Sequence, residues 1–166
     1  MLDIKRAMQA TAVLVAAGSY LGGHVALFAG EATSAYPKGY RTWAHVKSTL
    51  IGPQAPGFAS NGGLHHFYAN EQGLEGYRTG KFPDGAVLVD DLLEVKDNDA
   101  GVTSEGARRR LAVMTKDSRT QAATGGWSFE VFRGDSQEPT LTSEARAACF
   151  ACHAKSQESV FTKLRP

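Results

Sequence analysis

A five-residue motif near the C-terminus, Cys149-Phe150-Ala151-Cys152-His153, constrains this chain more than any other feature of its sequence. The pattern Cys-x-x-Cys-His is typical of c-type haem attachment, in which the two thiols form thioether bonds with the two vinyl groups of one haem. The histidine that follows can then coordinate the iron. The motif therefore predicts one covalent haem c, held by Cys149 and Cys152, with His153 as an axial ligand of the iron.

Zinc binding and thiol redox chemistry are the two weaker interpretations of this cysteine pair. A structural zinc site takes four ligands, but Cys149 and Cys152 are the only cysteines of the chain, and no pair of histidines accompanies them at zinc-binding spacing. A redox-active Cys-x-x-Cys pair is expected between a strand and a helix of a βαβ unit. The motif lies close to the C-terminus without such a pattern around it, which favours haem.

Residues 1–35 have the pattern of an export signal. Lys5 and Arg6 precede a stretch, 7–30, that contains no Asp, Glu, Lys or Arg, and small residues follow it. The uncharged stretch is long enough to be an uncleaved membrane anchor, but its glycines favour cleavage. We therefore expect a signal peptide at residues 1–35 and a single haem domain at residues 36–166. The expected location is the periplasm, with membrane anchoring if the leader stays attached.

The charge balance gives no sign of a nucleic-acid partner. The chain carries 18 Lys and Arg residues against 17 Asp and Glu residues, a formal net charge of +1, so no basic excess is available to neutralise phosphates. The one basic run, Arg108-Arg109-Arg110, is expected to be a solvated strand end. The alternative is a docking surface for an acidic redox protein.

Apolar spacing and turn residues predict a mixed α+β domain. Residues 39–50 place large side chains at intervals of three and four, which predicts an amphipathic helix, and a short helix is expected at 71–78. Strands are predicted at 64–69, 86–95, 109–116 and 127–132. A last helix is expected at 144–152, with Ser143 as its N-cap. The expected fold is an antiparallel β-sheet of about four strands, with an N-terminal helix and a C-terminal helix that carries the haem.

Few side chains could bind the iron opposite His153. The candidates are His45, His65, His66 and Met114. His65 and His66 are adjacent on a predicted strand, so they point to opposite faces and at most one of them can face the haem. A histidine on a half-buried strand is more often a hydrogen-bonded packing residue, and a methionine is more often part of the core. If none of them binds, the iron is five-coordinate and has an open position for a small molecule.

The order and spacing of several short motifs along residues 36–166 carry further information. They are Tyr36-Pro37-Lys38-Gly39-Tyr40-Arg41 with Trp43, Thr79-Gly80-Lys81-Phe82 with Asp84-Gly85, Lys116-Asp117-Ser118, Gly126-Trp127 with Phe129, and the haem motif followed by Val160-Phe161. Together they resemble the cytochrome P-460 and cytochrome c′-beta family. The resemblance implies a β-rich homodimer with one haem c per subunit, a proximal histidine and an open distal site. Members that oxidise hydroxylamine also have a lysine joined covalently to the porphyrin, whereas relatives without it look like nitric oxide or carbon monoxide binders.

Three positions of this chain depart from the hydroxylamine-oxidising branch. Counted from the anchor at 80–85, the cross-linking lysine falls on Asp90, which cannot form that bond. The distal glutamate of that branch falls on Ala112, and its distal arginine falls near Leu64, where the strand could slip by one residue. Asp90 is therefore either a polar group of the distal pocket or a solvated carboxylate at a strand end, because a carboxylate in an apolar pocket is costly unless it is paired.

Three functions remain open on these grounds. The first is a periplasmic haem protein whose five-coordinate iron binds nitric oxide or a similar small ligand and can pass an electron to a redox protein. The second is an enzyme that oxidises hydroxylamine or another small nitrogen species, with Asp90 as the catalytic base. The third is a six-coordinate electron carrier that uses His65, His66 or Met114. The first is favoured, because the groups for hydroxylamine chemistry are largely absent.

Overall fold

The structure is a computed structural model that describes residues 33–97 and 99–165. The predicted export signal at residues 1–35 lies almost entirely outside these ranges, so it stays a prediction. Within the described ranges, no helix combines the length and the apolar character needed to cross a membrane.

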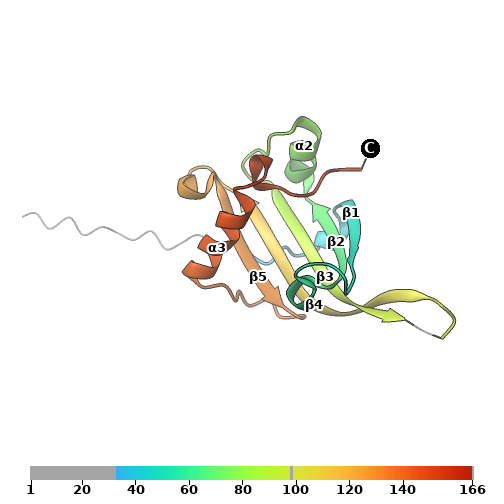
Figure 1. Cartoon of the computed structure of the whole chain (residues 1–166). Coiled ribbons are helices and arrows are strands. Elements are labelled where there is room, and N and C mark those ends of the chain that lie inside the picture. Colours follow the sequence, from blue (N-terminus) through green and yellow to red (C-terminus); the bar gives the residue numbers. More distant parts are fainter. Residues whose placement is uncertain (1–32, 98, 166) are drawn as a thin grey trace, which may run out of the picture.

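The described residues form one sheet of five antiparallel strands, which follow one another in the order of the chain (Figure 1). The strands are β1 (Ala44–Ile51), β2 (Gly63–Ala69), β3 (Val87–Asp97), β4 (Thr103–Lys116) and β5 (Trp127–Arg133). Each strand pairs with its neighbours in sequence, so the sheet is a meander. The two longest strands, β3 and β4, continue as a hairpin that projects from the body of the domain (Figure 1).

Three helices and three 3-10 turns connect and cover the strands in the described part of the chain. They are α1 (Phe58–Asn61), α2 (Glu71–Thr79), α3 (Ser143–His153), η1 (Tyr40–Thr42), η2 (Ala122–Thr124) and η3 (Gln157–Ser159). Helix α3 lies across one face of the sheet beside β5 (Figure 1). The structure therefore confirms a mixed α+β fold whose C-terminal helix carries the haem motif.

The prediction of a helix at residues 39–50 is wrong. This segment forms only the turn η1 and then strand β1, which pairs with β2 and is the strand missing from the predicted sheet of four. The register between β1 and β2 shifts between His45 and Lys47, so Val46 is an extra residue in the ladder. A bulge of this kind interrupts the alternation of a strand. As a result, the buried residues Tyr40 and Val46 have a spacing that imitates a helix.

Two predicted boundaries also need correction. Helix α3 begins at Ser143, but its N-cap is Thr142, whose side chain accepts a hydrogen bond from the amide of Ala145 at 3.3 Å. Strand β4 begins at Thr103, well before the predicted strand at 109–116, because its first half belongs to the projecting hairpin.

The two faces of the sheet pack against different parts of the chain. Side chains alternate between the faces along each strand. On the face toward α3, one apolar cluster packs against the helix through Cys149 and Phe150, and its buried members include Leu88, Trp127 and Phe129. The core of the other face consists of Tyr40, Val89, Leu111, Val113 and Phe132.

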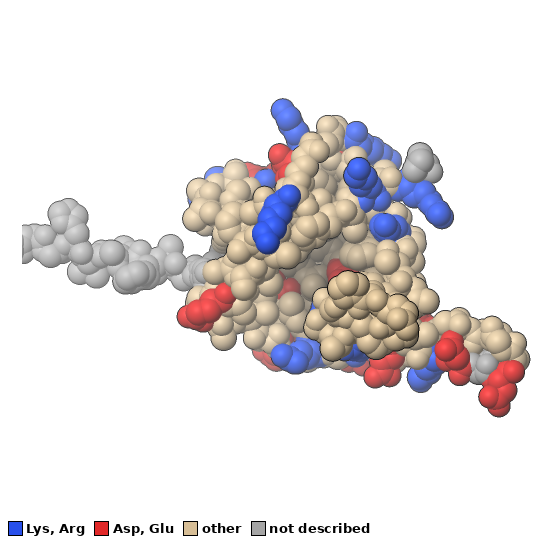
Figure 2. Space-filling view, in the orientation of Figure 1, with Lys and Arg blue, Asp and Glu red and all other residues tan. Residues whose placement is uncertain are grey.

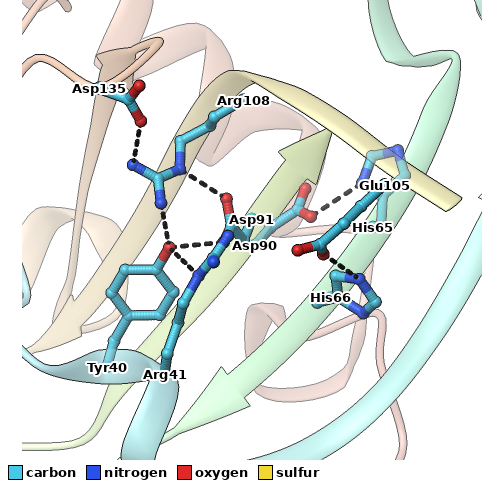
Figure 3. Close-up of polar contacts among 9 residues, drawn as sticks. All are labelled: Tyr40, Arg41, His65, His66, Asp90, Asp91, Glu105, Arg108 and Asp135. Carbon is cyan, nitrogen blue, oxygen red and sulfur yellow. Dashed lines mark hydrogen bonds and ion pairs between the residues drawn. The ribbon is translucent and has the colours of Figure 1, made fainter. Parts of the chain in front are cut away.

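A buried polar cluster lies on the face of the sheet away from α3 (Figure 3). Asp91 in β3 is fully buried and accepts hydrogen bonds from the hydroxyl of Tyr40, from Nε of Arg108 at 2.8 Å and from Nη2 of Arg41 at 2.9 Å. Arg108 also donates to Asp135 at 3.0 Å. Burial and the hydrogen bond to Asp91 raise the pKa of Tyr40 to about 12. Arg108 is therefore a structural ion-pair partner and not a solvated strand end.

Candidate functional site

A cavity of about 550 Å³ lies between the sheet and the segment formed by α3 and the C-terminal residues. Its lining comes from all five strands and from α1, α2 and α3, and it is mainly apolar. Figure 2 shows this face of the molecule hollowed between the C-terminal segment and the loop that carries α1. The volume falls in the range of pockets that hold cofactors and other small molecules.

Helix α3 brings two residues of the haem motif to the cavity. Cys149 and His153 both line it, because residues four apart lie on the same side of a helix. Cys152 is exposed, no disulfide joins the two cysteines, and burial raises the pKa of the Cys149 thiol. The described residues contain no group of three or more Cys, His, Asp or Glu side chains arranged to hold a metal ion. The arrangement therefore fits two thiols available to a haem better than a zinc site.

The ring of His153 is held in a defined orientation. Its Nδ1 donates a hydrogen bond to the carbonyl oxygen of Ser159 at 2.8 Å, and the ring lies between Phe129 and Phe161, with centroid distances of 5.1 and 4.7 Å. A carbonyl oxygen can only accept, so Nδ1 carries a proton, and in the neutral ring the lone pair is then on Nε2. Metal-binding histidines usually have this support from their other nitrogen. Nε2 of His153 is therefore ready to coordinate an iron.

The turn that supplies this carbonyl has an uncommon backbone. Glu158 and Ser159 have φ angles of 50° and 60°, in the left-handed region that residues other than glycine rarely adopt. Such a conformation persists only where other contacts support it. Here the support comes from the bond with His153 and from an ion pair between Glu158 and Lys116 at 3.7 Å.

Four side chains, those of Asn61, His65, Asp90 and Arg110, form the polar corner of the cavity. His65 is 3% exposed, and both its ring nitrogens donate, Nδ1 to Oδ1 of Asp90 and Nε2 to the carbonyl of Asn61, each at 2.8 Å. Burial alone lowers the pKa of His65, but the hydrogen bond and charge of Asp90 and the bond to Asn61 outweigh it, so the pKa is raised. Arg110 donates to the carbonyl of Ser60 at 3.1 Å and to the Asn61 side chain at 2.7 Å.

The sequence profile of the family Cytochrome P460 matches residues 37–162. This chain belongs to the cytochrome P460 family. Its cofactor is a covalently bound haem c, and the cavity fits that group because it presents a thiol, a histidine with a free Nε2 and mainly apolar walls. A search of curated proteins finds no match to the chain.

The structure separates the histidines that the sequence offers as a sixth ligand in this P460 protein. His66 lies on the other face of the sheet, where Nδ1 contacts Ser48 at 2.7 Å and Nε2 faces Glu105 at 3.3 Å (Figure 3). His45 is exposed and contacts the same serine at 3.0 Å. His65 lines the cavity, but both its nitrogens are occupied. Met114 also lines the cavity, so it is the remaining candidate among these four.

The positions that distinguish the hydroxylamine-oxidising branch of the P460 family can now be placed. Asp90 lines the cavity, where its side chain is 21% exposed and paired with His65, so it is not a solvated strand-end carboxylate. Ala112 lies opposite Asp90 in the ladder and also lines the cavity. On the strand where the distal arginine is expected near Leu64, the residue that lines the cavity is the neighbouring His65.

Arg110 is a cavity residue that sequence reasoning missed. Arg108 and Arg110 would share one face of a regular strand. However, Leu92 pairs with Arg110 while Leu93 pairs with Arg108, so Arg109 is an extra residue. This bulge turns Arg108 toward the buried Asp91 and Arg110 toward the cavity.

Proposed function

We propose that Nε2 of His153 binds the haem iron, and that the iron is five-coordinate with an open position for nitric oxide or a similar small ligand. The observation that carries this proposal is the difference between the two histidines of the cavity. His153 has a free Nε2 because its Nδ1 donates to Ser159, whereas both nitrogens of His65 already donate to acceptors. A histidine with two protonated nitrogens has no lone pair for a metal.

When bound, haem c supplies an iron centre that can take a small ligand and exchange one electron. The chain contributes Cys149 and Cys152 for attachment and His153 for coordination. The walls of the cavity are mainly apolar, and the polar corner adds one carboxylate and one guanidinium to it. Polar groups of this kind tune the affinity of a haem pocket for its ligand.

Ligand titration of the holo-protein tests the open position. We expect the ferrous protein to bind carbon monoxide and nitric oxide rapidly, and Met114→Leu to leave the association rates unchanged. A slow, displacement-limited reaction in the wild type that becomes fast in Met114→Leu would show that the Met114 sulfur occupies the sixth position. That result would overturn the proposal.

Oxidation of hydroxylamine or another small nitrogen species is a second candidate function, with Asp90 as the base. The location of the Asp90 side chain in the cavity favours it. Ala112 weighs against it, because this residue puts a methyl group where the enzyme branch has a glutamate. Turnover of hydroxylamine with an artificial electron acceptor, lost in Asp90→Asn and kept in Asp135→Asn, would establish this second function.

The proposal includes the setting of the protein. The predicted leader at residues 1–35 and the covalent haem support export to the periplasm, and the family resemblance supports a homodimer that exchanges electrons with a redox protein. Cell fractionation and light scattering of the purified holo-protein test location and dimer formation. A holo-protein found in the cytoplasm would contradict export, and a monomer at micromolar concentration would contradict the homodimer.

A further inference from the structure

The loop between β1 and β2, residues 52–62, covers one end of the cavity. It contains α1, and Pro56 and Asn61 contribute to the cavity lining. In Figure 2 the loop is the tan mass in front of the sheet, beside the hollow. The loop contains no Asp, Glu, Lys, Arg or His. Its attachment to the sheet therefore depends on charged groups supplied by other elements.

Four successive carbonyl oxygens of this loop accept hydrogen bonds from cationic side chains of the sheet. The pairs are Arg109 with Ala59 and Gly62, Arg110 with Ser60, and His65 with Asn61. The last carbonyls of a helix have no partner within the helix. Here β2 and β4 supply the donors, so the loop is held across the cavity by three side chains.

His65 differs from the two arginines because it can lose its proton near neutral pH, whereas an arginine in a protein stays charged. A neutral imidazole has only one N–H. Without its second proton, His65 would direct a lone pair either at the carbonyl of Asn61 or at the carboxylate of Asp90. One of its two hydrogen bonds would then be lost.

The groups around His65 come from each element that packs against it. Asp90 on β3 favours the protonated ring, and the charge of Arg110 on β4 opposes it. The pairing residue on β1 is the uncharged Thr49, and the ring of Phe67 stacks on His65 with a centroid distance of 5.9 Å. The proton on His65 is therefore held mainly by Asp90 and the Asn61 carbonyl.

We propose that residues 52–62 are a lid over the haem cavity, and that His65 is the positioning residue that latches this lid while it carries both ring protons. The proposal rests on the proposed function, in which a small ligand enters the cavity. Within the lid, Gly57 has a φ angle of 79° and precedes α1, so this position can change the path of the backbone at the start of the helix. Loss of the proton loosens the lid without detaching it, because Arg109 and Arg110 keep their bonds.

The sign of the pH dependence follows from the location of the proton. The pKa of His65 lies above the ordinary value of 6.5, because the hydrogen bond and charge of Asp90 and the bond to Asn61 outweigh burial, so the lid is latched at pH values below 6.5. As the pH rises through the raised pKa, the open state gains population. We expect about a tenfold increase, which is the size of effect that loss of one charged hydrogen bond produces.

Two measurements on the holo-protein test this lid. One is the amide hydrogen exchange of Asn61 and Gly62, expressed as protection relative to the free chain, between about pH 6 and pH 10. The other is the association rate of carbon monoxide with the ferrous protein after flash photolysis. We expect protection to fall and the association rate to rise together with pH in the wild type, and both to be independent of pH in His65→Gln. His66→Gln, a change at the neighbouring residue on the other face, should keep the wild-type profile.

Each alternative result overturns the lid. If the protection of Asn61 and Gly62 in the wild type does not change with pH, His65 does not latch the lid. The same conclusion follows if His65→Gln shows the pH profile of the wild type. A fall in protection without a change in association rate removes the role in ligand entry. If His65→Gln does not fold, the wild type and His66→Gln still test the lid. In both proteins, protection must fall and the association rate must rise with pH. A haem that takes no carbon monoxide at any pH would instead overturn the proposed function, while hydrogen exchange would still decide on the latch.

Discussion

Asp90 and Asp91 are adjacent in β3, yet their carboxylates lie on opposite faces of the sheet (Figure 3). Asp90 lines the cavity and accepts a hydrogen bond from His65, whereas Asp91 is fully buried against Arg108. Successive side chains of a strand alternate in this way. Of these two adjacent residues, Asp90 therefore belongs to the haem cavity and Asp91 to the buried core.

Asp90→Asn should lower the pKa of His65, because the hydrogen bond and charge that outweigh burial are lost. The variant should be about 2 kcal/mol less stable at about pH 6, where the wild-type histidine is protonated and the Asp90 carboxylate is charged. The wild-type contribution is complete below the ordinary histidine value of 6.5 and is lost as the pH rises through the raised value, so the difference between the proteins should shrink in alkaline solution. NMR titration of the imidazole and urea unfolding at several pH values measure both effects. Glu105→Gln, beside His66, is the control, and an unchanged His65 titration in Asp90→Asn would refute the pairing.

Asp91→Asn should destabilise the fold more strongly, by about 3 kcal/mol, because two arginines and a buried hydroxyl would lose a shared charged partner. The pKa of Tyr40 should fall from about 12, since the hydrogen bond and charge that help to raise it disappear while burial remains. Denaturant unfolding and ultraviolet titration of tyrosine check these outcomes. Asp135→Asn, at a side chain that is 91% exposed, should have little effect. Equal losses in the two variants would contradict the structural role of Asp91.

Glu130→Gln should weaken the attachment of α3 to the sheet. Glu130 is fully buried and accepts hydrogen bonds from the amides of Thr140 and Leu141 at 3.1 and 2.9 Å and from Arg146 at 2.6 Å. Burial alone raises its pKa, but the bonds with Arg146 and the backbone outweigh it, so the pKa is lowered. Its contribution is therefore complete above the ordinary value of 4.5 and is lost as the pH falls through the lowered value.

In Glu130→Gln, we expect a loss of about 2 kcal/mol at neutral pH and an acid transition with less dependence on pH. Acid and urea unfolding monitored by circular dichroism measure these changes. The exposed Glu138→Gln is the matched control. An acid transition identical to that of the wild type would show that the carboxylate does not hold α3.

Local sequence patterns were sufficient to predict the last helix and most of the strands. Cys149 and His153 follow from one contiguous motif. The short helix predicted at 71–78 and the strand predicted at 64–69 are both present in the structure, because their local sequence patterns are regular. The errors occur where pairing between strands adds a residue. The bulge at Val46 made a strand resemble a helix, and the bulge at Arg109 concealed the direction of Arg110. Bulges depend on the partner strand, so no local pattern records them.

The support of His153 could not be predicted for a related reason. The carbonyl of Ser159 reaches the ring because Glu158 and Ser159 adopt left-handed backbone angles, and neither residue type signals such a turn. For Asp90 the sequence leaves two alternatives, and the structure places its side chain in the lining of the cavity. Its partner His65 comes from a strand 25 residues earlier in the chain, so their contact depends on the register of β2 and β3.

The electron paramagnetic resonance spectrum of the ferric holo-protein at neutral pH tests the central claim most directly. An iron held by His153 alone, with His65 fully engaged in hydrogen bonds and Met114 part of the cavity wall, should give a high-spin signal. A low-spin signal in the wild type that becomes high-spin in Met114→Leu would show that the sixth position is filled and would contradict the account.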